Sequence, residues 1–481
     1  MDQIRPILLV VGILLTVIGV AMLIPTLVDL LADHEDWQVF LVSSGATLFI
    51  GGGLWITNAV PVTSLTLRQA FLLTTITWIV VVMFAAVPLY LCGLGLSVTD
   101  AVFEAMSGLT TTGSTVIVGL DDAPPGVLMW RALLQWLGGV GIIVMAIAVL
   151  PMLQVGGMQL FHLESSDRSD KILPRATQFV ASIAAVYGLL TLACAVGYMA
   201  AGMGNFDAVA HAMTTVATGG YSTKDASFGH FDSGAADYVA VVFMIAGGLP
   251  FTLYLLALRG SVGAILRDPQ VRLFMALLTL LVSAMTVYQI AREINAPGEA
   301  VRYAAFNVVS VMTGTGYATT DYGAWGAYAV TVFFFTMFIG GCAGSTSCGV
   351  KIFRVHVLWA AAEAEVRRLT LPHGVFTPRY GGRPLGQDVI SSVTAFLFLF
   401  LILFGALSLA LGLMGLDPLT AISASATALA NVGPGLGDVV GPSGSFASLP
   451  EAAKWLLSLG MLLGRLELFT VLVMFTPRFW Q

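Results

Sequence analysis

The chain has 481 residues, of which 57% are hydrophobic and only 10% are charged, and its mean hydropathy is +0.90. Soluble domains carry about 25% charged residues, so this composition excludes a soluble enzyme and indicates a polytopic membrane protein. The net charge of −6 argues against a nucleic-acid partner. Four cysteines in a chain of this length are too few for a disulfide framework. None belongs to a C-x-x-C pair, so we expect no structural zinc site.

Ten segments are long and apolar enough to cross about 30 Å of hydrocarbon as helices. They lie near residues 7–29, 38–60, 69–93, 128–152, 177–202, 236–258, 271–291, 325–350, 391–415 and 453–476. The first is too long for the apolar region of a signal peptide, so we expect it to remain in the mature protein. Four apolar stretches, near 99–111, 205–217, 299–314 and 417–431, are too short to span and are re-entrant candidates.

The basic residues predict an orientation. With the N-terminus inside and ten alternating spans, the inner side holds 15 of the 21 lysines and arginines. They are Arg5, Arg68, Arg168, Lys171, Arg175, Arg259, Arg267, Arg272, Lys351, Arg354, Arg367, Arg368, Arg379, Arg383 and Arg478. The positive-inside rule therefore predicts that both termini are cytoplasmic.

After the first two spans, the order of span, short helix, turn and span recurs four times. The turns contain Thr111-Thr112-Gly113, Ala217-Thr218-Gly219, Gly314-Thr315-Gly316 and Asn431-Val432-Gly433. Their last glycines recur at roughly 100-residue intervals, which predicts four structural copies in one chain. We assign the copies to residues 67–175, 176–268, 269–384 and 385–481, after a two-helix extension over 1–66.

These turns suit a cation filter. Non-helical backbone at membrane depth must be buried in protein or line a wet cavity. Four such turns on one axis would present rings of carbonyls, which replace the hydration shell of potassium in a selective pore. Glycine permits the positive φ that such turns need. The simpler alternative, that these small residues only let helices pack closely, explains one such turn better than four.

Five motifs make the chain resemble the Trk/Ktr/HKT superfamily of potassium transporters, most closely its bacterial TrkH type. They are Ser107-Gly108-Leu109-Thr110-Thr111-Thr112-Gly113, Trp130-Arg131 through Gln135-Trp136-Leu137-Gly138-Gly139-Val140-Gly141, Ala217-Thr218-Gly219-Gly220, Gly340-Gly341-Cys342-Ala343-Gly344-Ser345-Thr346 and Asn431-Val432-Gly433-Pro434-Gly435. The resemblance covers nearly the whole chain. It implies an all-α protein of ten transmembrane helices, in which four span–pore helix–filter–span repeats form one pseudo-fourfold pore.

The resemblance also implies the function and partners. The expected activity is potassium uptake across a bacterial cytoplasmic membrane, with potassium as substrate at the filter residues and no cofactor in this chain. Members of this type form homodimers and pair with a cytoplasmic nucleotide-binding ring protein, TrkA. Plant relatives with serine at the first filter glycine transport sodium, so Gly113 favours potassium. Channel-like flux and proton- or sodium-coupled symport both remain open.

Residues 340–349 interrupt an apolar run with four glycines and are the first gate candidate. So many poor helix formers would unwind a span, and an unwound loop below a filter could block it. An ordinary helix kink is the alternative. Family members carry an intramembrane gating loop here, so the resemblance assigns the gate to Gly340, Gly341, Cys342, Ala343, Gly344, Ser345, Thr346, Ser347 and Lys351.

Arg465 is the second gate candidate, because it lies about 20 Å into the last span at about 1.5 Å per residue. Charge at that depth usually faces a cavity, and the family's corresponding arginine faces the pore. The alternative is a buried ion pair with a carboxylate of another span. Glu467 is a poor partner, because it is only two residues away and lies on a different face of the same helix. Arg131 we expect to snorkel at the outer interface.

Two rival functions remain weaker. Gly435-Leu436-Gly437-Asp438 spells the signature of intramembrane aspartyl proteases, but the chain has no Tyr-Asp pair to supply a second catalytic aspartate. A solute transporter with broken helices would have inverted repeats, whereas these four share one orientation. No hydrolase motif is present, so we expect no enzymatic activity.

Overall fold

The computed structural model describes residues 4–59, 66–148 and 176–480, and these are almost entirely helical. The last residues of two expected spans, 60 and 149–152, and the basic residues Arg168, Lys171 and Arg175 lie outside the described part. The helices are α1 (Arg5–Ala21), α2 (Leu23–Leu31), α3 (Trp37–Thr57), α4 (Leu67–Leu91), α5 (Val98–Leu109), α6 (Pro125–Ala148), α9 (Ala176–Ala200), α10 (Asn205–Val216), α11 (Gly234–Gly248), α12 (Phe251–Leu258), α13 (Gly263–Arg267), α14 (Pro269–Ala291), α15 (Pro297–Thr313), α16 (Ala327–Phe338), α17 (Ile352–Thr370), α18 (Gln387–Leu413), α19 (Pro418–Ala430), α20 (Glu451–Arg465), α21 (Leu468–Leu472) and α22 (Pro477–Trp480).

Local sequence explains where several of these helices begin. Proline occupies the first turn of α14, α15 and α19, where its missing N–H costs nothing. Asp417 caps α19 by accepting the Thr420 N–H at 3.0 Å. At the start of α6, the Gly126 N–H donates instead to Asp29 of α2 at 2.6 Å, so the N-terminal extension caps a helix of the main body.

Seven described helices are long and apolar enough to span a membrane, or nine if two bent pairs each count as one span. The expected spans at 236–258 and 453–476 are therefore each a bent pair of helices and not one continuous helix. The pair α11 and α12 bends by 96°, because Gly247, Gly248 and Pro250 interrupt it. The pair α20 and α21 bends by 112° at Glu467, whose φ is +62°. The eighth expected span, 325–350, ends early, since α16 stops at Phe338 and the next helix starts at Ile352.

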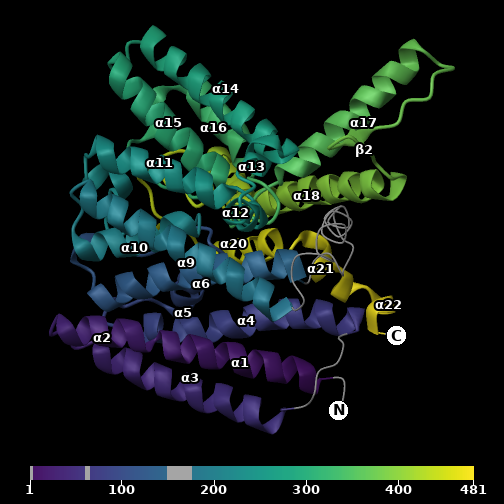
Figure 1. Cartoon of the computed structure of the whole chain (residues 1–481). Coiled ribbons are helices and arrows are strands. Elements are labelled where there is room, and N and C mark those ends of the chain that lie inside the picture. Colours follow the sequence, from purple (N-terminus) through teal and green to yellow (C-terminus); the bar gives the residue numbers. More distant parts are fainter. Residues whose placement is uncertain (1–3, 60–65, 149–175, 481) are drawn as a thin grey trace.

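The same packing recurs four times around the molecule (Figure 1). The short helices α5, α10, α15 and α19 each pack on the long helix before them, namely α4, α9, α14 and α18. Each short helix also contacts the helix that closes the previous copy. Those contacts pair α6 with α10, α11 with α15, α16 with α19 and α20 with α5. The last contact joins the fourth copy to the first and so closes a ring of four copies.

Two parts lie outside this ring (Figure 1). Helices α1, α2 and α3 form a layer beside α4, with α1 packed between α3 and α4. Helix α17 projects from the opposite side and is followed by the hairpin β1 (Arg379–Tyr380) and β2 (Arg383–Pro384), which pair antiparallel.

Candidate functional site

The four short helices end in the same way. Thr111 N–H bonds to the Gly108 carbonyl and Thr112 N–H to the Ser107 carbonyl, at 3.0 and 2.8 Å. These two bonds, with a left-handed residue at Thr111, form a Schellman motif. The equivalent six-to-one bond recurs from Gly219 to Thr214, from Thr315 to Ser310 and from Val432 to Thr427.

Each turn then alternates the sign of φ over three residues. The left-handed residues at the first and third positions are Thr111 and Gly113, Thr218 and Gly220, Gly314 and Gly316, and Asn431 and Gly433. We call residues 111–113, 218–220, 314–316 and 431–433 the turn ring. Threonine in this conformation is strained, and such strain persists where surrounding structure holds it.

This pattern changes the register of the second turn. The sequence aligned Gly219 with Gly113, Gly316 and Gly433, but the structure aligns Gly220 with them, so Ala217 lies one residue before the ring. Two adjacent glycines made the choice ambiguous, and the φ values decide it. Gly219 takes the position of Thr112. The space of its missing side chain is filled by the amide of Gln135, which donates to the Gly219 carbonyl at 2.6 Å.

The ring closes through contacts between successive turns. A Cβ on Gly113 would collide with the Gly219 carbonyl, one on Gly220 with the Thr315 carbonyl, and one on Gly316 with the Val432 carbonyl. On Gly433 it would lie 2.8 Å from the Thr112 carbonyl. Each third-position glycine therefore faces the second-position carbonyl of the next turn, and the fourth faces the first. The structure thus brings all four sequence-predicted turns together around one axis.

Residues 340–349, the glycine-rich loop, lie at the ends of the short helices. Ser347 donates its hydroxyl to the Thr313 carbonyl at the end of α15, at 2.6 Å. Thr346 donates to the Val216 carbonyl at the end of α10, at 3.1 Å. The Cys348 sulfur is 3.8 Å from the Thr111 hydroxyl, just after α5. The loop therefore reaches three of the four helix ends, whose carbonyls lack helical partners.

The loop also pairs with the break between α11 and α12. The Cys342 and Thr346 N–H groups donate to the carbonyls of Gly248 and Gly247, at 3.0 and 3.2 Å. In return the Phe251 N–H donates to the Gly344 carbonyl at 2.9 Å. Two interrupted helices thus satisfy each other's backbone groups, as buried backbone requires. Gly340 and Gly341 close the base of the loop against Val350 and Ile352.

Other loop residues are also hydrogen-bonded within this arrangement. The Ala343 N–H donates to the side chain of Gln270 at 2.9 Å, and the Ser345 hydroxyl to the Cys342 carbonyl at 2.6 Å. Lys351 donates its ammonium to the Ser347 carbonyl. Every expected gate residue between 340 and 351 therefore belongs to one compact, buried unit.

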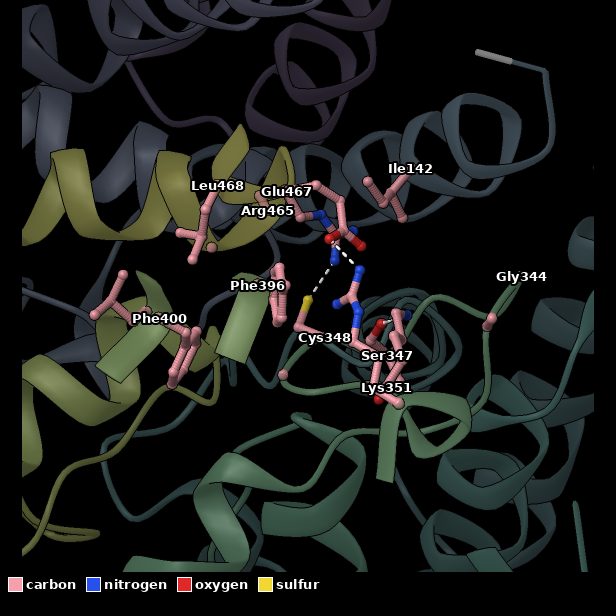
Figure 2. Close-up of a pocket in the computed structure, with 15 residues that line it drawn as sticks. Ile142, Gly344, Ser347, Cys348, Lys351, Phe396, Phe400, Arg465, Glu467 and Leu468 are labelled. Atoms are coloured by element: carbon pink, nitrogen blue, oxygen red, sulfur yellow. Dashed lines mark hydrogen bonds and ion pairs between the residues drawn. The ribbon is translucent and has the colours of Figure 1, made fainter. Parts of the chain in front are cut away.

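Arg465 lies against this unit and is 3% exposed. Its guanidinium donates to the Thr346 carbonyl at 3.1 Å and to the Gly138 carbonyl at 3.2 Å. It also donates to the Cys348 sulfur, as Figure 2 shows. Within the described ranges no carboxylate pairs with it, so the ion-pair alternative for Arg465 does not hold there. Glu467 instead pairs with Arg354 of α17.

A small cavity of about 30 Å³, large enough for a water or two, lies beside these groups (Figure 2). Its lining includes Lys351, Arg354 and Arg465, with Glu467 as the acidic member. The cavity is therefore net positive, which opposes the entry of a cation from this side.

Sequence reasoning missed the role of Arg131. It does not snorkel: it is 1% exposed and its Nε donates to Glu104 of α5 at 2.8 Å. Its guanidinium also donates to the Ser222 carbonyl at 2.8 Å and lies 4.1 Å from the ring centre of Tyr221. No local pattern links these residues, although a buried arginine in an apolar helix is itself a sign of a buried carboxylate partner.

Comparisons with known proteins identify the family of the chain. The chain is 48% identical to the Trk system potassium uptake protein TrkI of Halomonas elongata, over 99% of this chain and 97% of that protein. It is 39% identical to the Trk system potassium uptake protein TrkH of Vibrio parahaemolyticus, over the full length of both. The crystal structure of the Vibrio parahaemolyticus potassium transporter TrkH superposes with a TM-score of 0.92 over the whole of both chains, at 38% identity. The family model of the cation transport protein TrkH matches residues 37–481, and the chain therefore belongs to the TrkH family of cation transporters, not to a family of enzymes.

Proposed function

We propose that the protein takes up potassium through a pore whose selectivity filter is the turn ring. The closed contact of four turns with alternating φ carries this proposal. Alternation of left- and right-handed residues turns successive carbonyls to the same side of the chain, and carbonyl cages of this kind replace the hydration shell of potassium. The Trk relatives are named as potassium uptake proteins, which supports potassium as the cargo.

The second part of the proposal concerns gating. The glycine-rich loop and Arg465 together block the inner side of the filter in this conformation. The hydroxyls of Thr346 and Ser347 donate hydrogen bonds to the carbonyls at the ends of α10 and α15, which would otherwise face a cation. The guanidinium adds a positive charge beside them. Opening requires the loop to leave the α11–α12 break.

The wider assembly follows from the family. We propose ten spans in four repeats, both termini on the cytoplasmic side of a bacterial inner membrane, and a homodimer that pairs with a TrkA-type nucleotide-binding ring. Helix α17 and its hairpin, which project from the ring, are the surface that a cytoplasmic partner would meet. Coupling to protons or sodium through the same filter is the second candidate mechanism.

Uptake into proteoliposomes that contain this protein alone tests the proposal. A potassium gradient should drive rubidium accumulation that excess potassium inhibits and excess sodium does not. Collapse of the proton and sodium gradients separates the two mechanisms, because channel-like flux survives it and symport does not. Equal inhibition by sodium and potassium would refute a potassium-selective filter.

A further inference from the structure

Each short helix carries a polar side chain that holds the segment leaving its turn. The exit segments are residues 114–117, 221–223, 317–319 and 434–436. Asn307 of α15 accepts the Thr319 N–H at 3.3 Å, and Ser423 of α19 accepts the Leu436 N–H at 3.0 Å. In the second copy, His211 Nε2 lies 2.9 Å from the Ser222 hydroxyl. All three side chains are fully buried.

The first copy uses a charged group at the same place. Glu104 accepts the Val116 N–H at 2.9 Å through Oε2 and the Thr115 hydroxyl at 3.0 Å through Oε1. Like His211 and Asn307, it lies about two helical turns before the left-handed residue of its copy. Its charge is balanced by Arg131 of α6, at 2.8 Å, and both side chains are at most 2% exposed.

This ion pair reaches two copies at once. Arg131 holds the second exit segment through the Ser222 carbonyl and through the face of Tyr221. Tyr221 then donates its hydroxyl to the backbone carbonyl of Glu104 at 2.8 Å, which closes a loop of contacts between the copies. Hydrogen bonds from or to a charged group are shorter and stronger than neutral ones. The first and second exit segments are therefore held more firmly than the third and fourth.

We infer that Glu104 and Arg131 are positioning residues that set the selectivity of the filter, an inference that rests on the proposed function. They touch the exit segments, not the proposed ion positions. Discrimination between potassium and sodium depends on the size or the field strength of the carbonyl cage, and both change when the backbone behind the cage can shift. Loss of the ion pair loosens two adjacent quarters of the ring and lets it contract around sodium.

A purely structural role predicts something different. An ion pair that only docks α5 on α6 would change the amount of folded protein and leave the permeability ratio alone. The ratio does not depend on protein abundance, so it separates the two roles. A matched control exists on the same helix, where Asp100 pairs with Lys454 at 2.6 Å and contacts no exit segment.

The test measures the potassium-to-sodium permeability ratio, from reversal potentials or competitive rubidium uptake, in four variants of the full protein. Glu104→Gln and Arg131→Lys should each lower the ratio by about tenfold, which is the change that about 1.4 kcal/mol of lost preference for potassium produces. Asp100→Asn should keep the wild-type ratio. The double variant Glu104→Gln/Arg131→Gln removes both charges and leaves neither buried without a partner. It therefore replaces any single variant that fails to fold.

Two results would overturn the inference. One is a wild-type ratio in every folded variant of Glu104 and Arg131, and the other is an equal fall in Asp100→Asn. Failure of the proposed function is recognised separately, because the unmodified protein would then show no preference for potassium before any substitution is made.

Discussion

Removal of the charge at Arg465 is the sharpest test of the proposed gate. In Arg465→Gln the side chain keeps an amide that can donate to a carbonyl but loses the positive charge. Under the proposed gate, the charge raises the energy of a cation below the filter. The variant should therefore pass more potassium per folded molecule and keep its selectivity, which resides in the turn ring.

The structure gives the size of the effect. The guanidinium is 3.1 Å from the Thr346 carbonyl, and the Thr346 hydroxyl is 3.1 Å from the Val216 carbonyl at the end of α10. The charge is thus linked to that helix end through one residue, and at a separation on the order of 8 Å a pair of unit charges interacts by about 2 kcal/mol at an effective dielectric of 20. That energy corresponds to roughly thirtyfold in flux, and water in an open cavity reduces it to a few-fold.

The same substitution should destabilise the fold, which would lower total uptake and mask a gain in flux per molecule. Arg465 makes two hydrogen bonds to backbone carbonyls as a charged donor, each worth about 1.5–3 kcal/mol, and a weaker one to the Cys348 sulfur. Both Arg465→Gln and Arg465→Ala should therefore lower the yield of folded protein. Rubidium uptake must be normalised to the folded amount from size-exclusion chromatography. Equal or lower normalised flux in both variants, with wild-type flux in Arg465→Lys, would show that the arginine only supports the fold.

Two further predictions concern the filter and the loop. Gly113→Ser and Gly220→Ser should each lower the potassium-to-sodium ratio, because a Cβ at these positive-φ positions collides with the carbonyl of the next turn; an unchanged reversal potential in either would remove that turn from the filter. Deletion of residues 341–347 should raise flux in a folded protein, because it removes the hydroxyls that occupy the helix ends. Uptake below the wild-type level in that deletion would count against a blocking loop.

The sequence predicts the short helices well and the bends poorly. The apolar stretches at 99–111, 205–217, 299–314 and 417–431 match four helices to within a few residues, because the same turn ends each one. Ser97 and Asp417 also cap the first and the last of them. The bend after α11 has a local cause in Pro250. The bend after Arg465 has none, since Leu466 and Glu467 are compatible with a helix and only their tertiary contacts stop it.

Sequence reasoning about the site fails where the partner is distant. The register of the second turn was wrong by one residue because Gly219 and Gly220 are equally suited to a tight turn. The sequence shows how deep Arg131 lies in its span, which favours the outer membrane interface, but it does not show the carboxylate partner, Glu104 on α5. In both cases the missing information is a tertiary contact, Gln135 with Gly219 and Arg131 with Glu104, which hydropathy and spacing along the chain do not contain.

Four unequal copies in one chain would also explain how the single loop of the proposed gate can serve a ring of four turns. The turns share their backbone conformation, yet the side chains behind them are Glu104, His211, Asn307 and Ser423. Within the described residues only the third copy carries such a loop, and that loop contacts the ends of α5, α10 and α15. Four identical subunits would bring four such loops to a space that one already fills. Fusion of the copies would therefore let one loop close the ring, while the closing helices of the second and fourth copies bend without a loop of this length.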